Sequence, residues 1–239
     1  TLASEGRAVP EAEAAAPVVA AYASVGAALP GFELRVAGPD GKPIGDRQVG
    51  EIQLKGPSIM AGYLGDDEAT GRALDAGWLR TGDLGYLAEG ELYVVGRLKD
   101  LILKGGRNYV PQDLERAAES VEGIRRGCVV AFGVPDVDTG TESVVVVAES
   151  RAAAAAHPEL ARRVQEQALA AMGLKPDHVA IVPPGTVPKT SSGKIQRSRC
   201  RELWLAGALR PAIEPDVWAK TLVVGRAVAQ RLTARTRHG

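Results

Sequence analysis

A polar, glycine-bearing stretch lies between apolar runs near the middle of the chain: Gly96-Arg97-Leu98-Lys99-Asp100-Leu101-Ile102-Leu103-Lys104-Gly105-Gly106-Arg107-Asn108. Residues 90–95 before it, which end in Leu-Tyr-Val-Val, predict a strand that runs directly into this stretch. Residues 102–103 predict a second short strand, which turns at Gly105-Gly106 because glycine tolerates positive φ. Pro111 then opens a helix, since proline is tolerated in a first helical turn.

Two further segments share this polar, glycine-bearing character. Trp78-Leu79-Arg80-Thr81-Gly82-Asp83 precedes the central stretch, and Pro188-Lys189-Thr190-Ser191-Ser192-Gly193-Lys194-Ile195-Gln196-Arg197 follows it at a distance. The later segment is not a Walker phosphate loop, because Pro188 replaces the required first glycine and Ile195 replaces the required serine or threonine. Taken singly, the two segments also fit a turn aspartate and a solvated, mobile basic loop.

Composition excludes several classes of function. The 239 residues could hold one large domain or two small ones, and 29 basic against 29 acidic residues give no excess charge to favour nucleic acid. No run of eighteen apolar residues occurs, so we expect a cytoplasmic protein without stable membrane insertion. Cys128 and Cys200 belong to no metal-binding or disulfide pattern, so we expect two buried free thiols and no metal ligands.

The remaining pattern predicts a mixture of strands and helices. Alternation around the turn at 38–41 predicts a small antiparallel system of the kind that forms barrels, whereas valine-rich runs later in the chain predict buried strands. Beyond the strands already described, strands are expected at 32–36, 50–56, 128–134, 143–148 and 179–182. Helices are expected at 66–74, from Pro111 onward, at 158–172, at 198–205 and in the tail.

In this order and at this spacing, the three polar segments resemble the later motifs of the adenylate-forming enzymes. This superfamily contains acyl-CoA and aryl-CoA ligases, peptide-synthetase adenylation domains, luciferases and fatty-acyl-AMP ligases. The resemblance runs from about residue 24 to residue 209 and implies an α+β fold. Residues 1–96 would then form the end of the large N-terminal domain, a distorted β-barrel subdomain. Residues 97–210 would form the small C-terminal α+β lid domain, with a tail helix over 211–239.

The resemblance also implies a reaction, the ATP-dependent activation of a carboxylate. The carboxylate attacks the α-phosphate of ATP, and pyrophosphate leaves with Mg²⁺. Because charge builds on the phosphoryl oxygens in the transition state, a positioned cation lowers the barrier. By resemblance Lys194 is this catalytic cation, Asp83 holds the ribose hydroxyls, Arg97 braces the nucleotide, and Val94 packs against the sugar or base.

Lys99 occupies the hinge position of the family, just after Arg97. In the family the lid rotates about this hinge between two half-reactions, which requires a residue that absorbs a large dihedral change. Lys194 faces the active site in one half-reaction. The loop of Gly105, Gly106 and Arg107 faces it, and so faces the acyl acceptor, in the other.

Residues 106–115 resemble the fatty-acyl-AMP ligase branch, above all through Pro111-Gln112-Asp113. These ligases pass a fatty acyl group to the phosphopantetheine of an acyl carrier protein, feed polyketide or lipopeptide assembly, and largely avoid coenzyme A. Residues 5–10 are similar to the end of an insertion found in this branch, whereas Tyr109-Val110 replaces its usual His-Tyr pair. An acyl-CoA or aryl-CoA ligase is the alternative within enzymes, and a non-catalytic module that docks a carrier protein is the alternative outside them.

The early motifs of the superfamily do not occur in the sequence. It contains neither a Ser/Thr/Gly-rich phosphate loop with a lysine nor a Tyr-Gly-x-x-Glu segment for adenine and Mg²⁺. We therefore expect an N-terminal adenylation domain to precede Thr1 and to bind most of the ATP and Mg²⁺. On this reading the chain is inactive alone.

Overall fold

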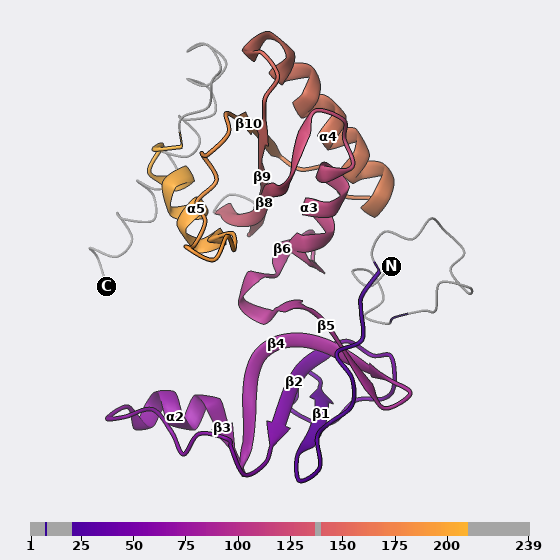
Figure 1. Cartoon of the computed structure of the whole chain (residues 1–239), viewed down its shortest axis with the longest axis vertical. Coiled ribbons are helices and arrows are strands. Elements are labelled where there is room, and N and C mark those ends of the chain that lie inside the picture. Colours follow the sequence, from indigo (N-terminus) through magenta and orange to yellow (C-terminus); the bar gives the residue numbers. More distant parts are fainter. Residues whose placement is uncertain (1–7, 9–20, 137–139, 210–239) are drawn as a thin grey trace. The chain divides into compact units, whose positions relative to one another are not determined.

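The computed structural model describes residue 8 and residues 21–136 and 140–209 of the chain (Figure 1). It divides into two compact units, Thr1–Leu101 and Ile102–Gly239, and each is described here by itself. The tail helix expected over 211–239 and most of the insertion-like residues 5–10 lie outside the described residues. The assignment of residues 1–96 and 97–210 to the two family domains stays a prediction.

The first unit is built on an antiparallel sheet in which the long, arched strand β4 is central (Figure 1). Along one path the strand order is β1-β2-β4-β3, and β5 pairs with β4 off this path. Alternate residues of these strands, among them Val36, Ile52, Leu84 and Val95, are buried and form the core. The strands are β1 (Glu33–Ala37), β2 (Gly50–Lys55), β3 (Leu74–Asp75), β4 (Trp78–Ala88) and β5 (Glu91–Arg97).

Short helical segments complete this unit. Helix α2 (Asp67–Ala73) begins at Asp66, whose side-chain oxygen accepts a hydrogen bond from the Ala69 N–H, as expected of an N-cap. The helix predicted to reach Leu74 ends one residue earlier, because Leu74 pairs with Leu79 of β4. A 3₁₀ turn, η2 (Leu98–Asp100), follows β5 and ends the unit.

The second unit is a layered α+β structure around a three-stranded mixed sheet of order β10-β9-β8. Strands β8 (Ile124–Asp136) and β9 (Thr141–Ser150) are antiparallel, and β10 (His178–Val182) runs parallel to β9. Helices α3 (Pro111–Glu119) and α4 (His157–Met172) cover one face, and α5 (Arg197–Leu205) covers the other (Figure 1). The valine-rich runs are buried because helices cover both faces of the sheet.

Each face of this sheet contributes to a core. Alternate residues of the three strands, including Val130, Val145 and Val182, pack with Cys200 and Trp204 of α5.

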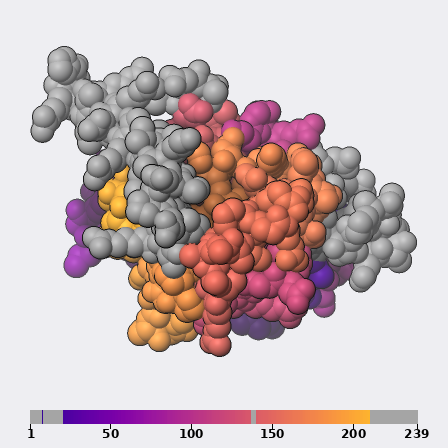
Figure 2. Space-filling model, turned by 90° about the horizontal axis from the view of Figure 1, so that it is seen from above, coloured from indigo at the N-terminus to yellow at the C-terminus, as the bar shows by residue number. Residues whose placement is uncertain are grey.

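A hairpin of β6 (Ile102–Lys104) and β7 (Arg107–Tyr109) precedes α3. The short η3 (Ala154–Ala156) leads into α4, and residues around 150–175, coloured orange, make up a large part of the surface in the space-filling view (Figure 2).

The α+β fold class is confirmed, as are the predicted strands and helices that lie within the described residues. Cys128 and Cys200 are buried free thiols, as expected. The sequence did not predict β4, because Thr81-Gly82-Asp83 has the composition of a turn and interrupts the apolar alternation. The segment lies in an irregular part of β4, where the register with β2 shifts between the Arg80 and Leu84 pairings and Gly82 has a left-handed φ of 71°. Within the described residues, no helix is long and apolar enough to cross a bilayer.

Candidate functional site

Asp83 and Arg97 lie directly opposite each other on β4 and β5. The Arg97 Nε atom lies 3.2 Å from Asp83 Oδ1, and the two side chains are 59% and 40% exposed. An ion pair this open to solvent contributes little to stability. The pair therefore leaves polar atoms of both groups accessible to a ligand.

The backbone around Asp83 is held by β2. The Thr81 hydroxyl donates to the Ile52 carbonyl at 2.7 Å and accepts a hydrogen bond from the Asp83 N–H at 3.0 Å. The Glu51 carboxylate accepts hydrogen bonds from the Gly82 N–H at 3.3 Å and from Arg80 Nε at 3.0 Å. These contacts fix the direction of the Asp83 side chain, and sequence reasoning did not identify Glu51 or Thr81 as contributors.

A shallow pocket lies beside this pair within the first unit. Its carboxylate can accept hydrogen bonds from the two hydroxyls of a ribose, and its guanidinium and ammonium groups can face phosphate oxygens. Val94 does not line the pocket; it lies opposite Gly85 on β5 and is 42% exposed. The lining residues are Thr81, Gly82, Asp83, Arg97, Leu98 and Lys99.

Lys194 lies at the end of a tight turn in the second unit. The Thr190 N–H donates to the Lys194 carbonyl at 2.8 Å, and the Lys194 N–H donates to Thr190 Oγ1 at 3.1 Å. The Gly193 N–H donates to the Thr190 carbonyl at 2.9 Å, and Lys189 bridges to Ile195. The loop that the sequence predicted here contains a hydrogen-bonded turn, which presents an exposed Lys194 side chain.

An ion pair between two mostly buried side chains, 15% and 12% exposed, holds the chain that follows Lys194. Arg197 Nη2 lies 2.8 Å from Glu115 Oε1 of α3, and Arg197 Nε donates to the Ala131 carbonyl of β8 at 3.0 Å. The same Glu115 oxygen accepts a hydrogen bond from the Ala131 N–H at 2.9 Å. Burial raises the pKa of the Glu115 carboxyl, and the charge of Arg197 acts in the opposite direction. The start of α5 is therefore tied to both α3 and the sheet.

A second buried carboxylate holds the chain that precedes Lys194. The Glu149 side chain, only 2% exposed, pairs with Arg125 of the neighbouring strand and accepts a hydrogen bond from the Val187 N–H at 2.9 Å. Closer to the turn, Lys189 Nζ lies 3.2 Å from the buried Cys128 Sγ. The Lys194 turn is thus anchored on the sheet from both sides.

The predicted site residues fall into two groups. Asp83, Arg97 and Lys99 lie together in the first unit. Lys194 belongs to the second unit, as does the turn of Gly105, Gly106 and Arg107, which lies at the tip of the β6–β7 hairpin. The hinge role of Lys99 stays a prediction, and its side chain is exposed in η2.

Sequence reasoning missed the anchoring residues Glu115 and Glu149. A signal for Glu115 existed, because it ends the Pro-Gln-Asp-Leu-Glu segment that already resembled a family motif. For Glu149 the sequence shows only a charged residue directly after a valine-rich strand, which ordinarily indicates the point where a strand reaches solvent. Among the described residues, no group of three acidic, histidine or cysteine side chains could hold a metal ion.

Comparisons with known proteins agree with this geometry. A family model described as "Disco-interacting protein 2-like, AMP domain" matches residues 99–213. A provisionally named acyl-CoA synthetase of Caulobacter vibrioides is 41% identical over 194 residues, covering 78% of this chain and 32% of the relative. The long-chain-fatty-acid–AMP ligase FadD32 of Mycolicibacterium smegmatis is 35% identical over an alignment of 249 positions, covering 87% of this chain and 39% of the relative.

Solved structures give the same result. A structure from a study of fatty acyl-adenylate ligases of E. coli and L. pneumophila matches with a TM-score of 0.71 and 35% identity, covering 84% of this chain and 36% of that one. The chain spans about a third of the length of the curated relatives it matches. The chain belongs to the adenylate-forming superfamily, and within it is most similar to the fatty-acyl-AMP ligases.

Proposed function

We propose that the chain supplies the ribose-binding edge and the catalytic lid of an ATP-dependent ligase that activates a fatty acid as its acyl-adenylate. The ligase then transfers the acyl group to the phosphopantetheine of an acyl carrier protein. The observation that carries this proposal is the exposed Lys194 on a hairpin anchored from both sides by buried carboxylates. If Lys194 were only part of a solvated basic loop, these anchoring contacts on either side of it would have no function.

The proposed reaction has two steps. In the first, a carboxylate oxygen of the fatty acid attacks the α-phosphorus of ATP, and the bond to the pyrophosphate oxygen breaks. In the second, the acceptor thiol loses its proton and attacks the acyl carbonyl, and AMP leaves. Lys194 would offset the negative charge that develops on the α-phosphoryl oxygens during the first step. Asp83 would accept hydrogen bonds from the ribose hydroxyls, and Arg97 would remain beside it as its charge partner.

The proposal includes an N-terminal adenylation region that carries the phosphate loop and most of the acyl pocket. This part of the proposal is supported by the lengths of the relatives, because the chain spans only about a third of each. Mg²⁺ bound with pyrophosphate would also be held there, since the described residues offer no cluster of metal ligands. We further propose a cytoplasmic enzyme that serves polyketide or lipopeptide assembly, and that the chain alone is inactive. Assays below therefore use a complete enzyme, in which the chain is joined to such a region.

Asp83→Ala in the complete enzyme is expected to raise the KM for ATP at least about tenfold, since a hydrogen bond to a charged group is worth about 1.5–3 kcal/mol. Because the Asp83 side chain is 40% exposed, thermal stability should change little. Steady-state kinetics at varied ATP measures this, with Asp40→Ala in an exposed turn as the matched control. An unchanged KM for ATP would remove Asp83 from the nucleotide site.

The choice of acceptor rests on resemblance to fatty-acid–AMP ligases in the relatives and in the solved structures. A coenzyme A ligase is the second candidate, favoured by the Caulobacter vibrioides relative that bears an acyl-CoA synthetase name. Mass spectrometry of the complete enzyme with ATP, a fatty acid, a holo carrier protein and coenzyme A separates the two. We expect an acylated carrier protein and little acyl-CoA, whereas abundant acyl-CoA beside an unmodified carrier protein would favour the second candidate. A docking module without activity would form neither product.

Carrier proteins typically present an acidic face, so an exposed arginine of the second unit should assist loading. Arg126 is exposed, whereas Arg125 is paired with the buried Glu149 and cannot be reversed in charge without disturbing the fold. Arg126→Glu is expected to reduce the rate of carrier loading about fivefold, an effect typical of the loss of one charge at an interface. Adenylate formation should stay unchanged. Lys42→Glu is the control at an exposed turn of the first unit. Equal loading by Arg126→Glu and the unaltered enzyme would place the carrier elsewhere.

A further inference from the structure

The β6–β7 hairpin begins where the second unit begins, at the fully buried Ile102. Its tip is Gly105-Gly106, where successive φ values of 58° and 75° form a tight turn that only glycine adopts readily. An isolated two-stranded hairpin is marginally stable in water. Contacts with the rest of the second unit must therefore hold this tip in place.

The first set of contacts joins the hairpin backbone to the start of β9. The Leu103 N–H donates to Glu142 Oε2 at 2.8 Å, and the Thr141 hydroxyl donates to the Leu103 carbonyl at 2.8 Å. The Gly105 N–H donates to Thr141 Oγ1 at 3.1 Å. On the edge of β6 that faces away from β7, side chains of β9 thus bond to the backbone in place of a partner strand.

The Glu142 carboxylate fits because residue 133 of β8 is glycine. A Cβ atom built on Gly133 would lie 2.1 Å from Glu142 Oε2. Any larger residue there would push the carboxylate away from the Leu103 N–H. The position of the hairpin is therefore set partly by Gly133 of β8.

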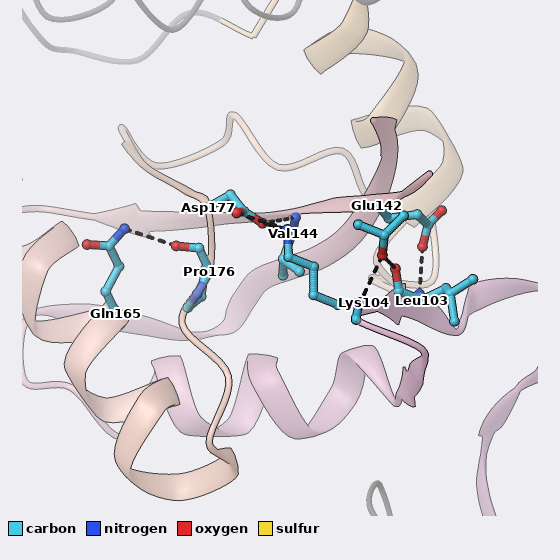
Figure 3. A network of polar contacts seen from close by, with 9 residues as sticks. Leu103, Lys104, Glu142, Val144, Gln165, Pro176 and Asp177 are labelled. Atoms are coloured by element: carbon cyan, nitrogen blue, oxygen red, sulfur yellow. Dashed lines mark hydrogen bonds and ion pairs between the residues drawn. The ribbon is translucent and has the colours of Figure 1, made fainter. Parts of the chain in front are cut away.

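The second contact is an ion pair at the other side of the hairpin. Lys104 Nζ lies 3.0 Å and 2.9 Å from the two oxygens of Asp177, the residue before β10 (Figure 3). Asp177 Oδ2 also accepts a hydrogen bond from the Val144 N–H at 2.7 Å. The segment leading to Asp177 is held in turn by Gln165 of α4, which donates to the Pro176 carbonyl at 3.0 Å.

We propose that Lys104, Glu142 and Asp177 are positioning residues for the acyl-transfer half-reaction. They fix the Gly105-Gly106-Arg107 tip to the sheet of the second unit, so that the tip moves with this unit as one body when the chain bends at residues 97–101. The inference rests on the proposed function, in which this tip faces the acceptor. Transfer should depend on the contacts, because small displacements of a positioning group slow a reaction steeply. Adenylate formation uses Lys194 and should not depend on these contacts.

The first test measures the hairpin itself, in the 239-residue chain. Lys104→Met and Asp177→Asn each remove the ion pair, and Asp177→Asn keeps an oxygen that can accept from the Val144 N–H. Hydrogen exchange followed by mass spectrometry should show faster exchange in residues 102–109 for both variants, with β8 and β9 unchanged. Lys42→Met, which breaks an exposed Lys–Asp pair of the first unit, should leave the hairpin unaffected.

The second test separates the half-reactions in the complete enzyme. Pyrophosphate exchange reports adenylate formation, and single-turnover transfer from preformed acyl-adenylate to holo carrier protein or coenzyme A reports the second step. Lys104→Met should slow transfer about threefold and Asp177→Ala about tenfold, with exchange within about twofold of the unaltered enzyme. Asp177→Asn should slow transfer by about as much as Lys104→Met. A general loss of stability would not produce this pattern of transfer rates.

Unchanged hairpin exchange, or an equal decline of both half-reactions, would overturn the inference. An unaltered enzyme that forms no acyl-adenylate would instead overturn the proposed function, and this inference with it. That outcome is visible before any variant is compared, so the two failures are distinguishable.

Discussion

Lys194→Ala in the complete enzyme is expected to lower the rate of acyl-adenylate formation by about a hundredfold to a thousandfold, the usual cost of removing one group that stabilises developing transition-state charge. The free energy of unfolding should change by less than about 0.5 kcal/mol, because the side chain is exposed. The turn should survive, since alanine retains the backbone N–H and carbonyl that bond to Thr190. Fatty-acid-dependent pyrophosphate exchange measures the rate, and chemical denaturation measures the stability.

The control for this variant is Lys42→Ala, which removes an exposed lysine from the first unit. A second comparison uses acyl transfer from preformed adenylate, which should be retained in Lys194→Ala because Lys194 is assigned to the first step alone. Adenylate formation at the unaltered rate would contradict the assignment of Lys194. Equal loss of both steps would show that the substitution disturbs the lid as a whole.

Glu149→Ala is expected to cost about 3 kcal/mol of stability, because it leaves Arg125 without its partner and the Val187 N–H without an acceptor. Denaturation of the chain by urea, followed by circular dichroism, gives this value directly. The matched control is Glu202→Ala, which removes an exposed carboxylate paired with Arg199 and should change stability by less than about 0.5 kcal/mol. A value for Glu149→Ala as small as the control would mean that the buried pair does not support the segment before Lys194.

The elements that the sequence predicted share a clear local signal. Valine runs covered by helices on both faces produced β8 and β9, and Pro111 at the first turn of α3 marked its start. Strand β4 lacked such a signal, because its central Thr81-Gly82-Asp83 has the composition of a turn. These residues belong to a strand because the residues around them pair with β2 and β5.

The residues of the site also divide into those that the sequence predicted and those that it did not. Resemblance identified Asp83, Arg97 and Lys194, and position on opposing strands explains why Asp83 and Arg97 pair. Apart from the family motif that ends at Glu115, the sequence contains no local signal for the groups that hold these residues. Glu149 is buried because Arg125 approaches from the neighbouring strand, and Glu115 is buried because Arg197 reaches it from α5. Both pairs join residues that lie 24 and 82 positions apart along the chain.

Pyrophosphate exchange by the complete enzyme, measured with and without a long-chain fatty acid, tests the proposed activity most directly. Exchange of label from pyrophosphate into ATP requires reversible formation of an acyl-adenylate, so it reports the first step without any acceptor. We predict exchange that depends on the fatty acid, is weakened at low ATP by Asp83→Ala, and is lost in Lys194→Ala. Fatty-acid-dependent exchange that is absent from a folded, unaltered enzyme would contradict the account.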